Sequence, residues 1–253
     1  MNKPRSFEKL WRKRFENFAT NAEDDAGIAG WSPTGLDARL RKFMEIWNSD
    51  NHILKKKLWL DAGCGAGTYS RFIAKQGMDI VGLDYSFPSL QKARSKGKEP
   101  ISWCVADINK IPLKPDYFDG VICFGVTQAL DDSTNAIHGL SRMIKPGGYV
   151  CIDALNSQCL PHIWGYLSRR IRNKSIHLRY ETVSNLHNLM KKNGLTNIQL
   201  YWLPILPARW YRYQWIVEAP LTKWIFRRTP FFGQLLSHAF VLRGQRLQDT
   251  PNA

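Results

Sequence analysis

The sequence lacks a long apolar segment, which limits how the protein can meet a membrane. Its longest stretch without a charged side chain runs only from Asn193 to Ala208 and contains two prolines. A membrane-spanning helix needs roughly 20 apolar residues. The first residues, Met1 to Arg5, lead into a charged segment and lack the apolar centre of a secretion signal. We therefore expect no transmembrane helix and a cytoplasmic location.

Paired cysteines are also missing. The five cysteines form no Cys-x-x-Cys motif and their number is odd, which disfavours both a disulfide framework and a zinc site. We expect reduced, mostly buried thiols without a chemical role, and no metal site. The residues are Cys64, Cys104, Cys123, Cys151 and Cys159.

Acidic residues are few relative to basic ones. The 253 residues include 36 Lys and Arg against 21 Asp and Glu, a net charge of +15. This excess favours an anionic partner: nucleic acid, an acidic membrane surface or a phosphorylated small molecule. Two basic clusters stand out, although each is also typical of an ordinary solvated surface. They comprise Lys3, Arg5, Lys9, Arg12, Lys13 and Arg14, and Arg169, Arg170, Arg172, Lys174 and Arg179.

With 44% apolar residues the chain can form a core, and short apolar runs alternate with helical patterns along its middle. The predicted strands are 58–60, 80–84, 101–107, 120–124 and 149–152, and the predicted helices are 68–76, 86–96 and 133–144, the last ended by Pro146-Gly147-Gly148. A further helix, 182–192, and strands 197–203 and 238–247 follow. Continuous apolar strands between helices predict an α/β, doubly wound, Rossmann-like sheet of seven mostly parallel strands with helices on both faces.

A glycine turn follows the first predicted strand. Its spacing is Gly63-x-Gly65-x-Gly67, and Asp61 stands just before it. A dinucleotide site would place its third glycine one residue later, beside a pyrophosphate. The carboxylate of Asp61 would repel a pyrophosphate but suits a ligand that carries ammonium or sulfonium charge. The turn therefore favours a cationic ligand.

Carboxylates end three consecutive predicted strands. Asp84 follows Asp61 by 23 residues, and Asp107 follows Asp84 by another 23. Aspartate is uncommon at the end of a buried strand, so the repetition indicates a site. Asp84 can accept both hydroxyls of a ribose, and Asp107 can accept an exocyclic amine of adenine.

These segments resemble the class I S-adenosylmethionine-dependent methyltransferases, in the branch of small-molecule and quinone methyltransferases. The resemblance covers about residues 30 to 156 and rests on LDAGCGAGTYS, VGLDYS, VADINKIPLKPDYFDGVICFG and MIKPGGYVCID. It implies S-adenosylmethionine as the cofactor. The implied cofactor-binding residues are Asp61, Gly63, Gly65, Gly67, Asp84, Tyr85, Asp107, Ile108 and Phe124.

The resemblance also implies a role for several of these residues. The glycines let the backbone approach the amino-acid part of the cofactor, and Asp84 holds the ribose. Tyr85 packs near the adenine, whose edge is read by Asp107 and the backbone of Ile108. Phe124 offers its carbonyl near the methionine amine. The segment from Gly30 to Thr34 matches a cofactor lid only weakly, and a structural role for Trp31 fits equally well.

No catalytic base stands out. Asp131 and Asp132 follow the fourth strand, but Asp-Asp-Ser before a helix is also a capping signal, which we favour. His138 lies within a predicted helix and is expected at the surface. His162 and His177 fall in a less regular basic segment, and either could reach a substrate. The catalytic residue is left open.

The insert 204–237 combines aromatic and basic side chains. Three interpretations remain: a cover packed on the sheet, an interfacial element for anionic lipid or a lipid-linked acceptor, and a surface that stacks on RNA. Prolines 207, 220 and 230 exclude one long helix. Its aromatic residues are Trp210, Tyr211, Tyr213, Trp215, Trp224, Phe226, Phe231 and Phe232, and its basic ones Arg209, Arg212, Lys223, Arg227 and Arg228.

The resulting hypothesis is a methyltransferase that uses S-adenosylmethionine and acts on a small-molecule or lipid-linked acceptor. An RNA methyltransferase and a non-catalytic cofactor-binding subunit are the alternatives, with nucleic acid the less favoured partner and peripheral contact with an anionic membrane a possibility. We divide the chain into a basic N-terminal helical segment with a cofactor lid (1–48), a cofactor-binding core (49–156) and the C-terminal half of the same domain (157–253), which contains the insert.

Overall fold

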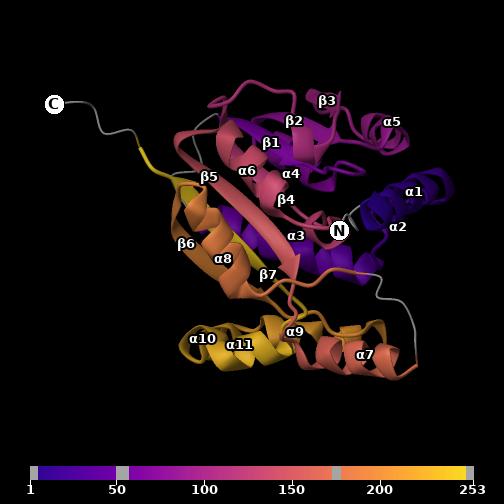
Figure 1. Ribbon diagram of the computed structural model, residues 1–253, viewed down its shortest axis with the longest axis vertical. Coiled ribbons are helices and arrows are strands. Elements are labelled where there is room, and N and C mark those ends of the chain that lie inside the picture. The colour runs from indigo at the N-terminus through magenta and orange to yellow at the C-terminus, as the bar shows by residue number, and fades with distance from the viewer. Residues whose placement is uncertain (1–4, 50–56, 173–177, 249–253) are drawn as a thin grey trace.

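The structure is a computed structural model that describes residues 5–49, 57–172 and 178–248. Its centre is one seven-stranded sheet in the order β3-β2-β1-β4-β5-β7-β6 (Figure 1). β7 runs antiparallel to both β5 and β6, and the other pairs are parallel. The strands are β1 (Leu58–Ala62), β2 (Asp79–Asp84), β3 (Ile101–Val105), β4 (Phe118–Cys123), β5 (Ile144–Leu155), β6 (Leu195–Leu203) and β7 (Ala239–Arg246). The predicted α/β sheet is confirmed.

Helices cover both faces of this sheet. The α-helices of the first two thirds of the chain are α1 (Arg5–Asn21), α2 (Asp25–Ile28), α3 (Pro33–Asn48), α4 (Thr68–Lys75), α5 (Phe87–Ser95), α6 (Thr134–Met143) and α7 (Leu160–Ile171). They are followed by α8 (Val183–Lys192), α9 (Gln214–Glu218), α10 (Pro220–Arg228) and α11 (Pro230–Leu236). Short 3-10 turns are η2 (Ile108–Lys110), η3 (Thr127–Ala129) and η4 (Ala208–Tyr213).

Two apolar clusters hold the layers together. On one face, α6 and α8 pack on the sheet through residues such as Leu140 and Leu186. On the other face, α3 and α4 pack through Phe43, Trp47 and Ile73. The sheet is thus buried on both sides, as expected of parallel strands that read as continuous apolar runs.

Side-chain caps fix where several helices begin. Ser32, Ser86 and Thr182 each accept a hydrogen bond from a backbone N–H in the first turn of α3, α5 and α8. Such a cap satisfies one of the amides that a helix start leaves without a partner. These caps explain why the predicted starts of α5 and α8 agree with the structure to within one residue.

Two predictions about local structure are wrong. Pro146-Gly147-Gly148 does not end the preceding helix, which stops at Met143; the three residues lie inside a long, irregular β5 that begins at Ile144. The segment after β5, which we predicted to be less regular, contains α7. Proline at the first turn of α7 is compatible with a helix start.

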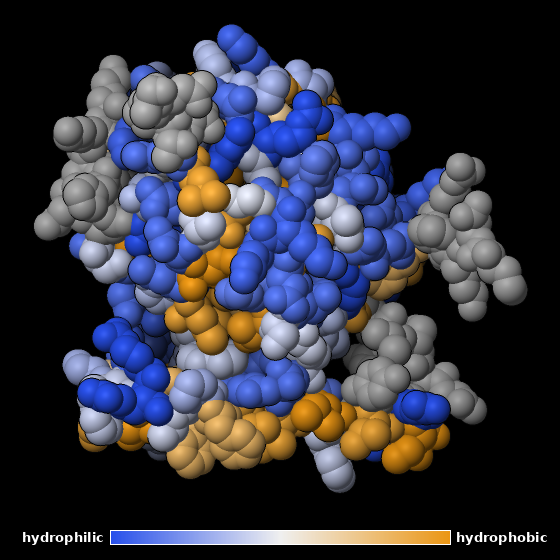
Figure 2. All heavy atoms as spheres, turned by 60° about the vertical axis from the view of Figure 1, so that its left-hand side comes forward, coloured by the Kyte–Doolittle hydropathy of each residue, from blue (hydrophilic) through white to orange (hydrophobic). Residues whose placement is uncertain are grey.

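Prolines divide the insert as predicted. η4 follows Pro207, α10 starts at Pro220, and α11 starts at Pro230. Within the described part of the chain, no helix is long and apolar enough to cross a membrane. The insert helices and α7 form a separate layer along one side of the molecule (Figure 1), and orange apolar residues gather along that side in Figure 2.

The cysteines match their prediction. All five are free, four are buried, and Cys104 is half-buried. Burial raises the pKa of the Cys151 thiol to about 12, so this thiol stays protonated near neutral pH. Such a thiol is a poor nucleophile.

Candidate functional site

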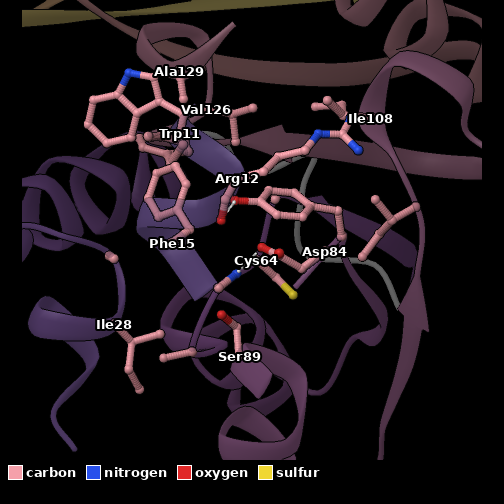
Figure 3. A pocket seen from close by; sticks show the side chains of 18 of the residues that line it. Trp11, Arg12, Phe15, Ile28, Cys64, Asp84, Ser89, Ile108, Val126 and Ala129 are labelled. Carbon is pink, nitrogen blue, oxygen red and sulfur yellow. Dashed lines mark hydrogen bonds between the residues drawn. The ribbon is translucent and has the colours of Figure 1, made fainter. Parts of the chain in front are cut away.

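A pocket opens at the carboxyl ends of β1, β2 and β4, beneath α1 (Figure 3). It encloses about 960 Å³ of space, part of which is open to solvent. Ligands of doubly wound sheets bind at this edge. Seven of the nine predicted cofactor residues line the pocket: Gly63, Gly65, Asp84, Tyr85, Asp107, Ile108 and Phe124.

The glycine turn forms the floor of the pocket. Gly63, Gly65 and Gly67 have φ angles of 78°, 51° and 76°, a region that side chains other than glycine rarely adopt. A Cβ atom at Gly63 would lie 2.2 Å from Val126, whereas one at Gly65 would meet no atom within 4 Å. The backbone at Gly65 is therefore bare toward the pocket. A ligand can approach this backbone closely.

Asp84 ends β2 and holds the glycine turn. Its two carboxylate oxygens accept hydrogen bonds from the backbone N–H groups of Gly65 at 2.9 Å and Ser86 at 2.8 Å. Burial raises the pKa of Asp84. A carboxylate has about four acceptor positions on its two oxygens, so Asp84 can still accept two hydroxyl groups from a ligand.

Asp107 lies one strand further along the same edge. It follows β3, and its Oδ1 atom accepts a hydrogen bond from the backbone N–H of Asn109 at 2.9 Å. Its other oxygen pairs with the guanidinium of Arg12. The structure therefore brings Asp84 and Asp107 to one pocket, as their places at the ends of neighbouring strands predict.

Asp61 and Gly67 are not part of the pocket wall. Asp61 is 1% exposed, and its Oδ2 atom accepts a hydrogen bond from the hydroxyl of Ser70 at 2.6 Å. Burial raises the pKa of Asp61 to about 7. Gly67 precedes α4, and a Cβ atom there would lie 2.5 Å from the Trp103 ring. Both residues support the turn from behind.

Helix α1 covers the pocket, which the sequence did not reveal. Trp11, Arg12 and Phe15 project from α1 over the glycine turn and Asp84 (Figure 3). The Arg12 guanidinium lies 5.3 Å from the centre of the Tyr85 ring, and the ring of Phe15 meets Tyr85 edge-on. Aromatic residues at spacings of three or four along α1 were the available signal.

A buried ion pair supports the far wall of the pocket. Arg39 of α3 donates to Asp153 of β5 at 3.3 Å, and Asp153 also accepts the backbone N–H of Gly125 at 2.6 Å. The Arg39 guanidinium stacks over the ring of Trp31 at 4.3 Å, and Trp31 lines the pocket. Trp31 thus lines the pocket, as the resemblance to a cofactor lid predicts, and it also has a structural contact with Arg39.

Two aromatic side chains add polar atoms to the wall. Tyr69 packs against Phe124 with ring centres 4.8 Å apart. The hydroxyl of Tyr69 and the indole N–H of Trp31 are buried and have no hydrogen-bond partner among the described residues. Buried polar groups usually have partners. Each of these atoms is therefore available to a ligand.

The charge of the pocket contrasts with that of the whole chain. Its wall carries the carboxylates of Glu8, Asp25, Asp84 and Asp107 and the guanidinium of Arg12. Asp107 pairs with Arg12, and Asp25 pairs with Arg71 and Lys96 behind the wall. The site keeps a net negative charge, although the chain carries a net charge of +15. An acidic pocket attracts a cation and repels phosphate. The pocket therefore suits a ligand with ammonium or sulfonium charge, as the glycine turn predicts.

The candidate bases differ in their surroundings. Asp132 accepts hydrogen bonds from the backbone and hydroxyl of Thr134 at the start of α6, which agrees with the favoured capping interpretation. The backbone N–H of Asp131 donates to Glu8, and burial raises the pKa of Asp131. His138 is exposed, as expected, and its ring contacts Asn193.

A histidine pair lies near the carboxyl end of β5. His162 Nε2 is 2.8 Å from His238 Nδ1, and His162 Nδ1 is 2.7 Å from the carbonyl oxygen of Asn156. Burial lowers the pKa of His238 to about 3. Neither ring lines the pocket. His177, the other histidine considered, lies outside the described residues, as do Lys3 and Lys174.

No metal-ligating group of three or more His, Cys, Asp or Glu side chains occurs in residues 5–49, 57–172 and 178–248.

Comparison with known proteins identifies the central region. Residues 60–152 match the family described as methyltransferase domain. The chain is 36% identical over 104 residues to the malonyl-[acyl-carrier protein] O-methyltransferase of Salmonella typhimurium, covering 41% of each protein. It is 31% identical over 148 residues to the ubiquinone biosynthesis O-methyltransferase of Aliivibrio fischeri, covering 57% of this chain and 62% of that protein. The chain thus spans about two fifths to three fifths of these curated relatives.

Solved structures show the same fold over nearly the whole chain. The magnesium protoporphyrin IX methyltransferase of Synechocystis superposes with a TM-score of 0.62 at 12% identity, covering 95% of this chain and all of that one. A possible histamine N-methyltransferase of Thermotoga maritima gives a TM-score of 0.60 at 17% identity, covering 92% and 98%. Residues 60–152 thus belong to the methyltransferase-domain family, and nearly the whole chain has the α/β fold of S-adenosylmethionine-dependent methyltransferases.

Proposed function

We propose that the protein transfers a methyl group from S-adenosylmethionine to a small-molecule or lipid-linked acceptor. One observation carries this proposal: an acidic pocket in a strongly basic chain, with a bare glycine backbone at its floor. We further propose that the enzyme works in the cytoplasm, with peripheral contact at an anionic membrane.

The pocket has the donor and acceptor groups that the cofactor requires. We propose that Asp84 accepts the ribose hydroxyls, that Asp107 and the backbone of Ile108 bind the adenine edge, and that Tyr85 packs beside the adenine. The backbone at Gly63 and Gly65 then lies against the amino-acid part. The free lone pairs of Asp84 and the bare backbone at Gly65 support this arrangement.

Other groups would hold the charged end of the cofactor. The unpartnered hydroxyl of Tyr69 and indole N–H of Trp31 can donate to its carboxylate. The Phe124 carbonyl can accept its amine, and Asp61, behind the turn, adds negative charge near it. Asp61 thereby acts on the cofactor through the electrostatic field rather than through direct contact.

The cofactor supplies a methyl group already made electrophilic by a sulfonium centre. The chain must hold the acceptor in line with that methyl group, and orientation of this kind can lower a barrier by about 7–11 kcal/mol. Trp11 and Phe15 exclude water above the pocket. A base is needed only where the acceptor must lose a proton before attack, and we assign none.

The test is a labelling experiment. The purified protein is incubated with methyl-labelled S-adenosylmethionine and a bacterial lysate separated into lipid, RNA, protein and small-metabolite fractions. We expect label in the lipid or metabolite fraction, and none with the Gly65→Ala variant, whose added methyl group fills the cofactor site. Label in RNA would contradict the acceptor class, and transfer by Gly65→Ala at the parent rate would contradict the site.

A further inference from the structure

The layer formed by α7 and the insert helices exposes an unusual number of large apolar side chains. We call its outward side the apolar face and define it by Trp164 and Ile171 of α7, Trp215 of α9, Leu221 and Trp224 of α10, and Phe231 of α11. Trp164 is 77% exposed and Ile171 84% exposed. Orange residues run along this side in Figure 2. Soluble monomers rarely leave such a patch open to water.

The helices of this layer are fixed to the body by their inner sides. Phe226 of α10 is buried, and Glu218 of α9 pairs with Arg41 of α3. The side-chain amide of Asn156 donates to the carbonyl oxygens of Gln234 and Ser237, which ties the segment between β5 and α7 to the end of α11. The apolar face is therefore the outward side of packed helices.

This exposure rules out one interpretation of the insert. A cover packed on the sheet would bury its aromatic side chains, yet Phe226 is the one buried aromatic residue of 204–237, all of which the structure describes. The helix α7, which the sequence did not predict, extends the same exposed surface. We therefore expect a partner other than the sheet to cover these exposed apolar side chains.

The part of the chain that contains the apolar face is strongly basic. Residues 157–237 contain twelve Lys and Arg but only two acids, and both acids pair with arginines, Glu181 with Arg179 and Glu218 with Arg41. Exposed arginines occur on or directly after elements of the same layer: Arg170 and Arg172 at the end of α7, Arg209 and Arg212 in η4, and Arg227 and Arg228 at the end of α10. Any occupant must accept apolar side chains and carry negative charge at its edge.

We propose that the apolar face docks on the surface of an anionic lipid bilayer. Short amphipathic helices that carry tryptophan on one side and arginine at the rim lie in the membrane interface rather than across it. Aliphatic side chains such as Ile171 and Leu221 gain little from stacking on RNA bases. A second copy of the chain would bring two strongly basic rims together. A bilayer avoids both difficulties.

The position of the apolar face fits the proposed reaction. β1, β4 and β5 are parallel, so their carboxyl ends share one edge of the sheet. The pocket lies at this edge, and Asn156, just after β5, contacts the insert. A docked bilayer would lie on that side. Docking itself needs no methyl transfer, whereas delivery of a lipid-linked acceptor from the bilayer rests on the proposed function.

The test compares flotation with two kinds of vesicle, phosphatidylcholine alone and phosphatidylcholine mixed with phosphatidylglycerol. We expect the parent to float with the anionic vesicles, less with the neutral ones, and less at high salt because salt screens the arginines. The combined variant Trp164→Ala, Trp215→Ala and Trp224→Ala should bind at least about a hundredfold more weakly, since each tryptophan loses its apolar burial in the interface.

A matched control removes three exposed apolar side chains elsewhere: Phe87→Ala, Tyr117→Ala and Leu247→Ala. This variant should float like the parent. Titration with S-adenosylmethionine checks that both variants are folded, and it also separates this proposal from the proposed function, because cofactor binding needs no vesicles and docking needs no cofactor.

Two results would overturn the proposal. One is a parent that does not float with vesicles of either composition, whether it stays monomeric or dimerises through the apolar face in sedimentation velocity. The other is a tryptophan variant that floats as well as the parent.

Discussion

Alanine substitutions at two glycines with left-handed backbones can separate an effect on stability from an effect on cofactor binding. Gly65 has φ 51° and Gly77 has φ 80°, and a Cβ atom at either would meet no atom within 4 Å. Alanine at each position should therefore destabilise the fold by the left-handed backbone alone, about 1–2 kcal/mol. Urea unfolding should give similar losses for Gly65→Ala and Gly77→Ala.

Cofactor binding should distinguish the same two variants. The Cβ atom of Gly65→Ala stands where the cofactor has to approach the backbone, whereas Gly77 lies just after α4, away from the pocket. Calorimetric titration should show parent-like affinity for Gly77→Ala and a loss of at least about a hundredfold, about 2.8 kcal/mol, for Gly65→Ala. Equal affinities for the two variants would refute the placement of the cofactor on the glycine turn.

Three further predictions concern buried groups. Because burial raises the pKa of Asp61 to about 7 and a cationic ligand favours the carboxylate, S-adenosylmethionine should release protons on binding and bind more weakly below about pH 7, as calorimetry in several buffers can measure. Arg39→Met should destabilise the fold by about 3–5 kcal/mol in urea unfolding, and less at acid pH, where Asp153 is neutral. Gly120→Ala should cost about 1–3 kcal/mol, since its Cβ atom would lie 2.4 Å from the Trp59 ring.

Each of these predictions has a contrary result. Binding of S-adenosylmethionine that takes up or releases no protons near neutral pH would argue against a titrating Asp61. A penalty for Arg39→Met that is independent of pH would mean that the ion pair with Asp153 does not account for it. Unfolding of Gly120→Ala at the parent urea concentration would show that β1 and β4 can adjust around Trp59.

The sheet and most of the site could be predicted because their signals are local. A parallel strand buried on both faces reads as a continuous apolar run, and Asp84 and Asp107 stand at the ends of such runs. The order of the strands then brings both carboxylates to one edge. Gly63 and Gly65 follow the same logic, since a tight turn after a strand needs a left-handed backbone.

The contacts that complete the pocket had no local signal. Arg39 and Asp153 are 114 residues apart in the sequence, and their pairing depends on how α3 packs against β5. The sequence shows the aromatic residues at helical spacing along α1, but it does not show which part of the fold they pack against. Trp11 could equally have faced the sheet, and only the fold places it over the glycine turn.

The helix α7 was missed for a different reason. Leu160, Ile163, Trp164, Leu167 and Ile171 follow a helical spacing that the sequence contains. The cluster of arginines at its end favoured an irregular basic segment instead. Large apolar side chains follow the same helical periodicity whether they are buried or stay exposed after folding. The pattern therefore predicts a helix but does not say whether its apolar side is buried.

The central claim is that the acidic pocket holds S-adenosylmethionine with Asp84 on the ribose. The most direct measurement is a titration of the parent and of Asp84→Ala with S-adenosylhomocysteine and with its 2′-deoxy analogue. The account predicts that the parent prefers the ribose form by about tenfold or more, because a hydrogen bond to a charged group is lost with the hydroxyl, and that Asp84→Ala binds both weakly without preference. A parent that binds the two ligands equally, or an Asp84→Ala variant that keeps the preference, would contradict it.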